Sequence, residues 1–142
     1  PSLYSIGLAH KHLPEMQKLA GLDSAPVFVP ILGDIRQGMM TSVMLQNKLL
    51  SGTPTAQDIC EMLSSYYEGQ EMVRVLPFGG ETPRLATSAL AGKDYLTITV
   101  SGHTDQTLLT AQFDNLGKGA SGAAVQNMNL MLGFPETTGL NL

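Results

Sequence analysis

The sequence predicts an α+β domain in which a mixed or antiparallel sheet carries its helices on one face. Residues 95–101 alternate apolar and polar side chains, as in a strand with one exposed face. Residues 53–68 instead place apolar side chains at helical spacing. The predicted elements follow the order strand, helix, strands, helix, strands, helix. This order lacks the strict strand–helix alternation that a parallel sheet requires, so it favours the α+β class.

The first third of the chain predicts two strands and a short helix. Residues 4–9 are typical of a short strand. A helix is expected from about Pro14, which suits a first helical turn, to Ala20, with Gly21 ending it. Residues 25–32 carry an apolar run between two prolines and predict a short buried strand.

The middle third predicts a strand and the clearest helix of the chain. Residues 39–46 are typical of a strand, in which four side chains would share one face: Met39, Thr41, Val43 and Leu45. The helix over 53–68 would be capped by Thr53, with Pro54 in its first turn. Its buried stripe would comprise Ile59, Met62, Leu63, Tyr66 and Tyr67.

The last third predicts a hairpin and a closing helix. Residues 72–76 are expected to form a short strand, and residues 77–94 a loop with a strand near 85–90. Residues 95–101 and 107–113 would pair around the turn at 102–105. A helix over about 120–132 would end at a glycine and a proline, Gly133 and Pro135.

Composition bounds the possible functions. The length of 142 residues fits a single domain, residues 1–142, and the net charge of −4 comes without a lysine or arginine cluster, which argues against nucleic-acid binding. No apolar run approaches the roughly 18 residues that span a bilayer. The single cysteine, Cys60, fits a reducing cytoplasm, and its acidic neighbours favour an inert core thiol. Charged residues make up only 14% of the chain, which suggests either that a partner or another domain covers part of its surface or that the surface is neutral and rich in Gly, Ser and Thr. The start at Pro1 suggests a processed or excised fragment.

The densest cluster of titratable groups is His10-Lys11-His12 with Glu15. If His12 and Glu15 meet around a first helical turn, the carboxylate would orient the imidazole as a general base. The alternative interpretation is an exposed turn without chemistry. A metal site is weaker still because no third ligand stands at a typical spacing, so none is predicted.

A glycine-rich segment, residues 117–122, matches G-x-G-x-x-G before the last helix. Too few residues follow it to complete a dinucleotide-binding unit. The helix start would still attract a phosphate or carboxamide oxygen. The alternative is that its small residues allow close helix packing.

Two segments together resemble one enzyme family, the N-acetyl-gamma-glutamyl-phosphate reductases. Residues 7–16, Gly-Leu-Ala-His-Lys-His-Leu-Pro-Glu-Met, resemble its H-[RK]-H-x-P-E-[IM] signature. Residues 114–133 resemble its closing D-N-L-x-K-G-A-[AS]-G-x-A-V-Q-N-x-N-[LI] motif almost position for position. Their order and distance also fit, so the resemblance covers essentially the whole chain.

The resemblance implies an NADP-dependent reduction of N-acetyl-glutamyl 5-phosphate to the 5-semialdehyde, in cytoplasmic arginine biosynthesis. It implies a homo-oligomer and a fold like the C-terminal domain of aspartate-semialdehyde dehydrogenase. An N-terminal Rossmann domain, absent from this chain, would bind most of the NADP, and the helix over 118–133 would lie near it. The nucleophilic cysteine is missing as well, so the chain alone is expected to be inactive.

The resemblance also assigns candidate site residues. His12 is the first candidate for the catalytic histidine and His10 the second. Arg36 and Glu15 are candidates for binding the acyl-phosphate substrate. The residues that would approach the cofactor are Gly119, Gln126 and Asn127.

Departures from the family pattern leave other readings open. The family's P-H-L is Pro30-Ile31-Leu32 here, and Gln37-Gly38 replaces its Arg-Gly, which weakens Arg36 as an anion ligand. The alternatives are a non-catalytic interaction or oligomerisation module derived from the family, and an aspartate-semialdehyde dehydrogenase-like reductase.

Overall fold

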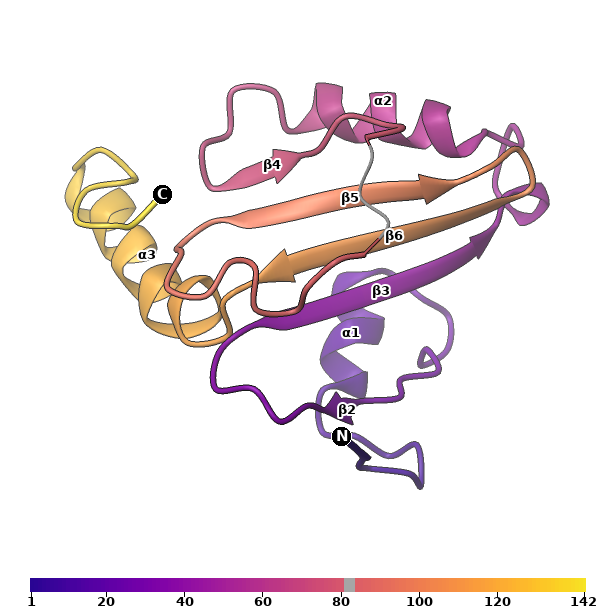
Figure 1. The fold of residues 1–142 in the computed structure, drawn as a ribbon, viewed down its shortest axis with the longest axis horizontal. Coiled ribbons are helices and arrows are strands. Elements are labelled where there is room, and N and C mark those ends of the chain that lie inside the picture. The colour runs from indigo at the N-terminus through magenta and orange to yellow at the C-terminus, as the bar shows by residue number, and fades with distance from the viewer. Residues whose placement is uncertain (81–83) are drawn as a thin grey trace. The chain divides into compact units, whose positions relative to one another are not determined.

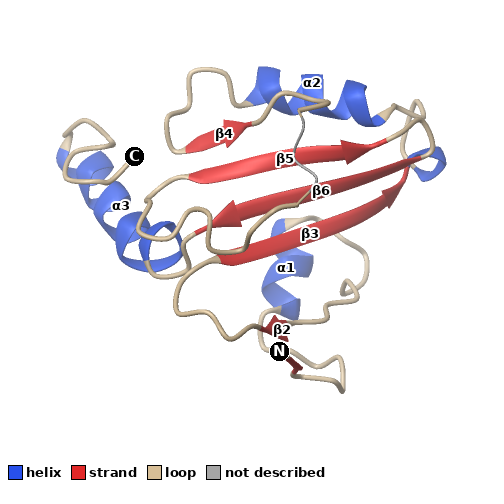
Figure 2. Cartoon of the chain, in the orientation of Figure 1, coloured by secondary structure: helices blue, strands red, loops and turns tan. Residues whose placement is uncertain are grey.

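The chain divides into two units in a computed structural model that describes residues 1–80 and 84–142. Unit 1 comprises Pro1–Arg36 and unit 2 comprises Gln37–Leu142. Figure 1 traces the chain, and Figure 2 separates its helices from its strands. The α+β class with a mixed sheet is confirmed.

Unit 1 contains one helix and two very short strands. Strands β1 (Ser2–Leu3) and β2 (Ile31–Leu32) pair antiparallel, and helix α1 spans Leu13–Leu19. The predicted helix is confirmed, with Pro14 in its first turn and Gly21 in the left-handed conformation just beyond its end.

Both strands predicted in unit 1 were wrong in extent. Residues 4–9 form a turn because Ser5 and Leu8 adopt positive φ, which breaks an extended run. The segment 25–32 is not a buried strand. Only Ile31–Leu32 pair, and the flanking prolines donate no N–H to a ladder. The apolar side chains lie exposed, Val27 at 82%, apart from half-buried Phe28.

Unit 2 is built on a four-stranded sheet of order β3-β6-β5-β4 (Figure 1). The strands are β3 (Met39–Gln46), β4 (Val73–Val75), β5 (Leu96–Gly102) and β6 (Gln106–Phe113). Neighbours pair antiparallel except β4 and β5, which run parallel. The predicted strand at 39–46 and the predicted hairpin are therefore confirmed, whereas no strand forms near 85–90 and residues 81–83 lie outside the described part.

Helix α2 (Ala56–Tyr66) covers one face of this sheet over β4 and β5 (Figure 2). The cap is Thr55 and not Thr53: its hydroxyl accepts the Asp58 N–H, and its own N–H donates to the Asp58 carboxylate. Thr53 has positive φ and stands outside the helix. The side-chain hydroxyl and backbone N–H of Thr55 both lower the pKa of Asp58.

The core lies between α2 and the sheet. Its buried members are Ala56, Ile59, Cys60 and Val100. The predicted stripe was partly wrong, because Met62 and Tyr66 are 61% and 78% exposed while Cys60 and Ala56 take the buried positions. The buried stripe therefore runs through Ala56, Ile59, Cys60 and Leu63, so it begins one turn earlier in the helix than predicted.

The other sheet face is not simply exposed, as the alternation of 95–101 had suggested. Thr97, Thr110 and Gln112 point there and are buried. The Gln112 amide donates to the carbonyl oxygen of Ala86 at 3.0 Å, which ties the loop after residue 84 to this face. A loop, and no helix, therefore covers part of the polar face.

The closing helix forms as predicted but begins with a wider turn. Residues Gly117–Ser121 form a π-helical turn (η2), and α3 follows from Gly122 to Leu132. Gly133 ends the helix in the left-handed conformation. Figure 1 shows α3 beyond the end of the sheet where β6 finishes.

Candidate active site and the glycine-rich turn

His10 sits in an aromatic setting in unit 1. The ring edges of Tyr4 and Phe28 contact it, with centroids 5.5 Å and 5.1 Å from the His10 ring. The Tyr4 hydroxyl lies 2.9 Å from His10 Nε2. His10 is half-buried, so its ring is held on several sides.

The proton position on His10 follows from its partners. The backbone N–H of His12 donates to His10 Nδ1 at 3.2 Å, so this nitrogen presents a lone pair. A neutral His10 ring therefore carries its proton on Nε2 and donates it to the Tyr4 oxygen. Both ring nitrogens of His10 are engaged, and neither is available as a base without breaking a contact.

His12 has the opposite arrangement at the N-terminal cap of α1. Its Nδ1 lies 3.2 Å from a carboxylate oxygen of Glu15, one turn into the helix. An ionised carboxylate only accepts, so the neutral His12 ring carries its proton on Nδ1. The Nε2 lone pair is then free. Because 52% of the side chain is exposed, a ligand can reach it.

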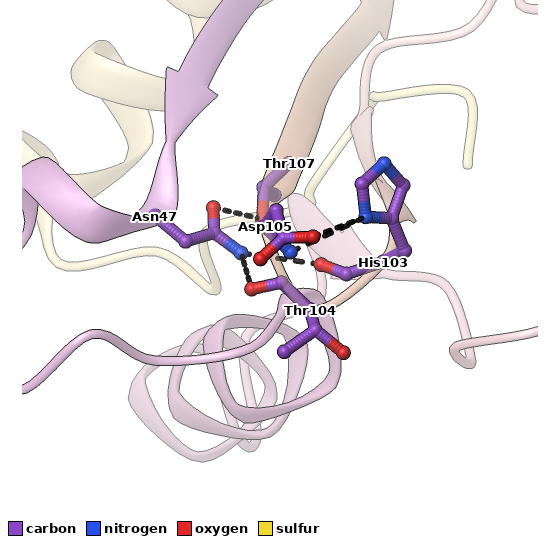
Figure 3. Close-up of polar contacts among 5 residues, drawn as sticks. All are labelled: Asn47, His103, Thr104, Asp105 and Thr107. Atoms are coloured by element: carbon purple, nitrogen blue, oxygen red, sulfur yellow. Dashed lines mark hydrogen bonds and ion pairs between the residues drawn. The ribbon is translucent and has the colours of Figure 1, made fainter.

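The third histidine, His103, lies in the hairpin turn of unit 2, and Figure 3 shows it beside Asp105. The Asp105 N–H donates to His103 Nδ1 at 3.2 Å, which places the proton on Nε2. Buried Asn47 braces this turn by donating to the carbonyl oxygens of His103 and Thr104 and accepting from the Thr107 hydroxyl. Of the three histidines in the chain, only His12 thus presents a free Nε2 lone pair beside a carboxylate.

Arg36, the predicted anion ligand, is exposed at the end of unit 1 and makes no hydrogen bond to a described residue. The neighbouring Gln37 opens unit 2 and donates to the Asp114 carboxylate at 3.0 Å. The Gly38 N–H donates to the Asn115 side chain at 2.8 Å. The Asp-Asn pair that begins the closing motif therefore anchors the start of β3.

Asp114 is fully buried at the end of β6 and accepts only from uncharged donors. These are the backbone N–H groups of Gly92, Leu116 and Gly117 and the side chain of Gln37. Burial raises the pKa of the Asp114 carboxyl, but these donors outweigh it and hold the pKa below its usual range. Asp114 thus remains a carboxylate and shapes the turn that follows.

Two of the three predicted cofactor ligands are engaged inside unit 2. The Gln126 amide accepts from Lys118 and donates to Glu136, so its oxygen and one of its protons are used. The Gly119 N–H donates to the carbonyl oxygen of Asp114 at 2.8 Å. Asn127 lies exposed on α3, and its amide makes no hydrogen bond to a described residue.

Lys118 is the half-buried cation of the glycine-rich turn. Burial lowers the pKa of its ammonium group, and the carboxylates of Glu136 and Asp94 oppose this shift. The ammonium group donates to the Gln126 amide oxygen of the same chain.

Other possible sites contribute little. Cys60 is buried, 3% exposed, in the core with its thiol 3.5 Å from the Leu76 carbonyl oxygen. Among residues 1–80 and 84–142, no three metal-binding side chains gather around one point. Within the same residues, no helix has the length and apolar character needed to cross a membrane.

Sequence reasoning missed the residues that support the predicted histidines. Tyr4 and Phe28 lie 6 and 18 positions from His10, and no local spacing signals that their rings meet it. The capping interaction of His12 with Glu15 was detectable, since an i, i+3 pair at a helix start predicts it.

Three relatives are similar to this chain over almost all its length. The N-acetyl-gamma-glutamyl-phosphate reductases 2 of Nostoc sp. and Pseudomonas putida are 41% and 45% identical over 97% and 96% of the chain. The N-acetyl-gamma-glutamyl-phosphate reductase of Brucella ovis is 47% identical over 92%. The matched segment is 45%, 45% and 44% of these relatives, so the chain spans about half their length.

A family model covers the same region. Residues 1–115 match the semialdehyde dehydrogenase dimerisation domain, which includes the histidine segment, the sheet and α2. This match extends over most of the chain and agrees with the mixed sheet of unit 2. The chain therefore belongs to the family of semialdehyde dehydrogenase dimerisation domains.

Proposed function

We propose that this chain is the catalytic and dimerisation part of an N-acetyl-gamma-glutamyl-phosphate reductase, an oxidoreductase of arginine biosynthesis in the cytoplasm. The identity to three reductases of that name supports the proposal. The reaction would reduce N-acetyl-glutamyl 5-phosphate to the 5-semialdehyde. The remaining half of the protein would supply the nucleophilic cysteine and the nucleotide-binding domain.

The observation that carries the proposal is the His12–Glu15 pair. The carboxylate fixes the proton on Nδ1 and leaves the Nε2 lone pair pointing away from it. A histidine oriented in this way is the usual general base of nucleophilic catalysis. His12 would remove the proton of the attacking thiol and later return a proton to the product.

The other unit 1 residues would have supporting roles. His10 would hold the loop before α1 by accepting the His12 N–H. Glu15 would orient His12 and would also contact the substrate. Arg36 has a free guanidinium suited to the acyl phosphate or the carboxylate of the substrate.

The cofactor would be NADP, whose reduced form, NADPH, supplies a hydride when it is bound. The residues of unit 2 fit such a ligand in part. Asn127 offers an exposed amide for a hydrogen bond, and Gly119 lies exposed on the turn with its N–H bonded to the Asp114 carbonyl oxygen. Gln126 is held by Lys118 and Glu136, so it would support the turn unless binding releases it.

The exposed apolar surface of α3 favours contact with the absent half of the protein. Met128, Met131 and Leu132 are 50%, 86% and 62% exposed. Exposed apolar side chains gathered on one helix mark an interaction surface. We assign the helical region 118–133 to contact with an N-terminal nucleotide-binding domain.

Self-association would use the sheet face opposite α2. Met44 pairs in register with Leu108 on that face, and they are 82% and 37% exposed. The family description as a dimerisation domain supports a second copy of the protein as the occupant. A homo-oligomer therefore accompanies the proposed enzyme.

The function can be tested on the full-length protein. Purified protein is mixed with N-acetyl-glutamate 5-semialdehyde, phosphate and NADP, and the absorbance of NADPH is followed in this reverse direction. Turnover with this substrate and little with aspartate semialdehyde is expected. Equal or greater turnover with aspartate semialdehyde would replace the proposed substrate, and no reduction of NADP with either would reject the enzyme.

A further inference from the structure

Two glycines of the G-x-G-x-x-G segment accommodate a carboxylate of the same chain. A Cβ at Gly122 would lie 2.2 Å from Asp94 Oδ1, and one at Gly117 would lie 2.9 Å from the same atom. Real Cβ atoms do not approach an oxygen at 2.2 Å, so a side chain at Gly122 would displace Asp94. Gly122 is the first residue of α3 and has an ordinary helical φ of −62°. The close approach of Asp94, and not the backbone conformation, therefore requires a glycine here.

Asp94 is held by the C-terminal segment through Asn141. The Asp94 N–H donates to the Asn141 carbonyl oxygen at 2.8 Å, and the Asn141 N–H returns a bond to Asp94 Oδ2 at 2.9 Å. The Asn141 amide also donates to the Gly92 carbonyl oxygen at 2.6 Å. We refer to these three bonds as the Asn141 clasp.

The same segment is fastened to α3 along its way. Asn129, only 2% exposed, donates to the backbone oxygens of Glu136 and Thr138 at 3.0 and 2.9 Å. Residues 134–141 therefore run back from the end of α3 to the loop before β5. Gly92 of that loop also donates to buried Asp114, which sets the turn from its other side.

The position of Asp94 has an electrostatic consequence. The start of a helix carries a partial positive charge, which a carboxylate stabilises. Asp94 supplies that carboxylate from within the chain, and Lys118 of the same turn is attracted to it. An anion of a ligand would have to displace Asp94 to bind in this place.

We infer that Asp94 is a positioning residue that sets the glycine-rich turn and the direction of α3, and that the Asn141 clasp holds Asp94 in place. The inference rests on the proposed function in one respect, because Asn127 of α3 is assigned there to the cofactor. Loss of the clasp would then impair cofactor binding more than the chemical step. The contact with the glycines does not depend on any activity.

The first experiment uses Asn141→Pro in the full-length protein, because proline removes both the N–H that donates to Asp94 and the side-chain amide that donates to Gly92. Gln57→Ala is the control, since Gln57 is an exposed amide on α2 that donates to Glu61 of the same helix. Amide hydrogen exchange followed by mass spectrometry should be about tenfold faster or more over residues 117–132 in Asn141→Pro, and unchanged over β6. Unchanged exchange over 117–132 would overturn the role of the clasp.

The second experiment tests the contact itself by suppression. Gly122→Ala should lower the melting temperature, and adding Asp94→Ala should restore part of the loss, because it relieves the contacts of the new Cβ with Asp94 Oδ1 and Cγ but not the contact with the Gly117 backbone carbon. Additive losses in the double variant would overturn the contact. If Gly122→Ala alone fails to fold, recovery of a folded double variant still supports the contact, and failure of both contradicts it.

A kinetic readout separates positioning from stability. In Asn141→Pro we expect the KM for NADPH to rise about tenfold while kcat stays within about twofold, since a contact that supports the glycine-rich turn is lost. An equal fall in kcat with unchanged KM would overturn the link to the cofactor. If the protein reduces no acyl phosphate, the proposed function fails, whereas the exchange and suppression results still decide the role of Asp94.

Discussion

The two units of this chain differ in how their structure is stabilised. None of the residues of unit 1 is buried, whereas unit 2 encloses an apolar core between α2 and its sheet. Unit 1 nevertheless carries the paired histidines. The proposed chemistry is therefore assigned to unit 1, which is ordered by polar and aromatic contacts around His10 and His12. Most of the stability is assigned to unit 2, which lacks these contacts.

The comparison predicts a separation of effects. Substitutions in unit 1 should change turnover and leave the free energy of unfolding almost unchanged. Substitutions in the core of unit 2 should do the opposite. All substitutions below are made in the full-length protein.

Met72→Ala should destabilise unit 2 by about 2–5 kcal/mol, because it leaves a cavity beside the sheet. Met72 is 1% exposed, and Met62 of α2 is 61% exposed. The free energy of unfolding is measured by urea denaturation. Met62→Ala is the matched control and should change it by less than about 0.5 kcal/mol. A loss for Met72→Ala as small as that of the control would show that Met72 is not packed in the interior of unit 2.

His12→Asn should lower turnover by roughly 10² or more, because the base of the proposed reaction is removed. The steady-state kcat is the measurement. His103→Asn removes an exposed histidine of unit 2 and should leave kcat unchanged. A near wild-type kcat for His12→Asn would transfer the role to His10.

Glu15→Gln should lower kcat about tenfold, because the amide can offer His12 Nδ1 an N–H and so permit the other tautomer. Glu61→Gln on α2 is the control with a comparable exposed side chain. The temperature midpoint of unfolding should be the same in both variants. No change of kcat would show that Glu15 does not orient His12.

Asp114 should stabilise unit 2 in a pH-dependent manner. Its folded-state pKa lies below the ordinary value of 3.8, so the unfolded chain binds a proton first as the pH falls. Its stabilising contribution is complete above pH 3.8 and is lost as the pH falls through the lower folded-state pKa. Asp114→Asn should flatten this acid limb of a plot of unfolding free energy against pH. An unchanged acid limb would contradict the assignment.

Cys60→Ala should retain full turnover, because the thiol is buried in the core of unit 2 and contacts only the Leu76 carbonyl oxygen. The kcat of the variant is compared with that of the parent protein at equal concentrations of folded protein. An inactive but folded Cys60→Ala protein would give this cysteine a part in the reaction.

The sequence predicted unit 2 better than unit 1, and the reason is physical. Alternation and helical spacing at β5 and α2 reflect burial within the same chain, so they are visible in the sequence. The apolar run at 25–32 also resembles a buried strand, but most of its side chains are exposed in this chain. An apolar pattern does not reveal whether the surface that covers it belongs to the same chain. The cap was misplaced by two residues since both Thr53 and Thr55 suit the position, and positive φ at Thr53 is not encoded by its residue type.

The candidate site was predictable to the extent that it is local. The His12–Glu15 pair spans one turn and follows from spacing. The contact of Tyr4 with His10, and that of Asp94 with Gly122, join positions whose proximity no spacing reveals. For the glycine-rich segment, the structure supports the alternative interpretation, close packing, because a Cβ at Gly117 or Gly122 would meet Asp94.

The central claim is that the two histidines of the motif carry their protons on different nitrogens. Nitrogen-15 NMR of the full-length protein, labelled only in its histidine rings, reports the protonated nitrogen of each neutral ring directly, and His12→Asn and His10→Asn assign the signals. We expect the proton on Nδ1 in His12 and on Nε2 in His10. A His12 ring protonated on Nε2 would contradict the account, since its free lone pair would then face Glu15 and not a substrate.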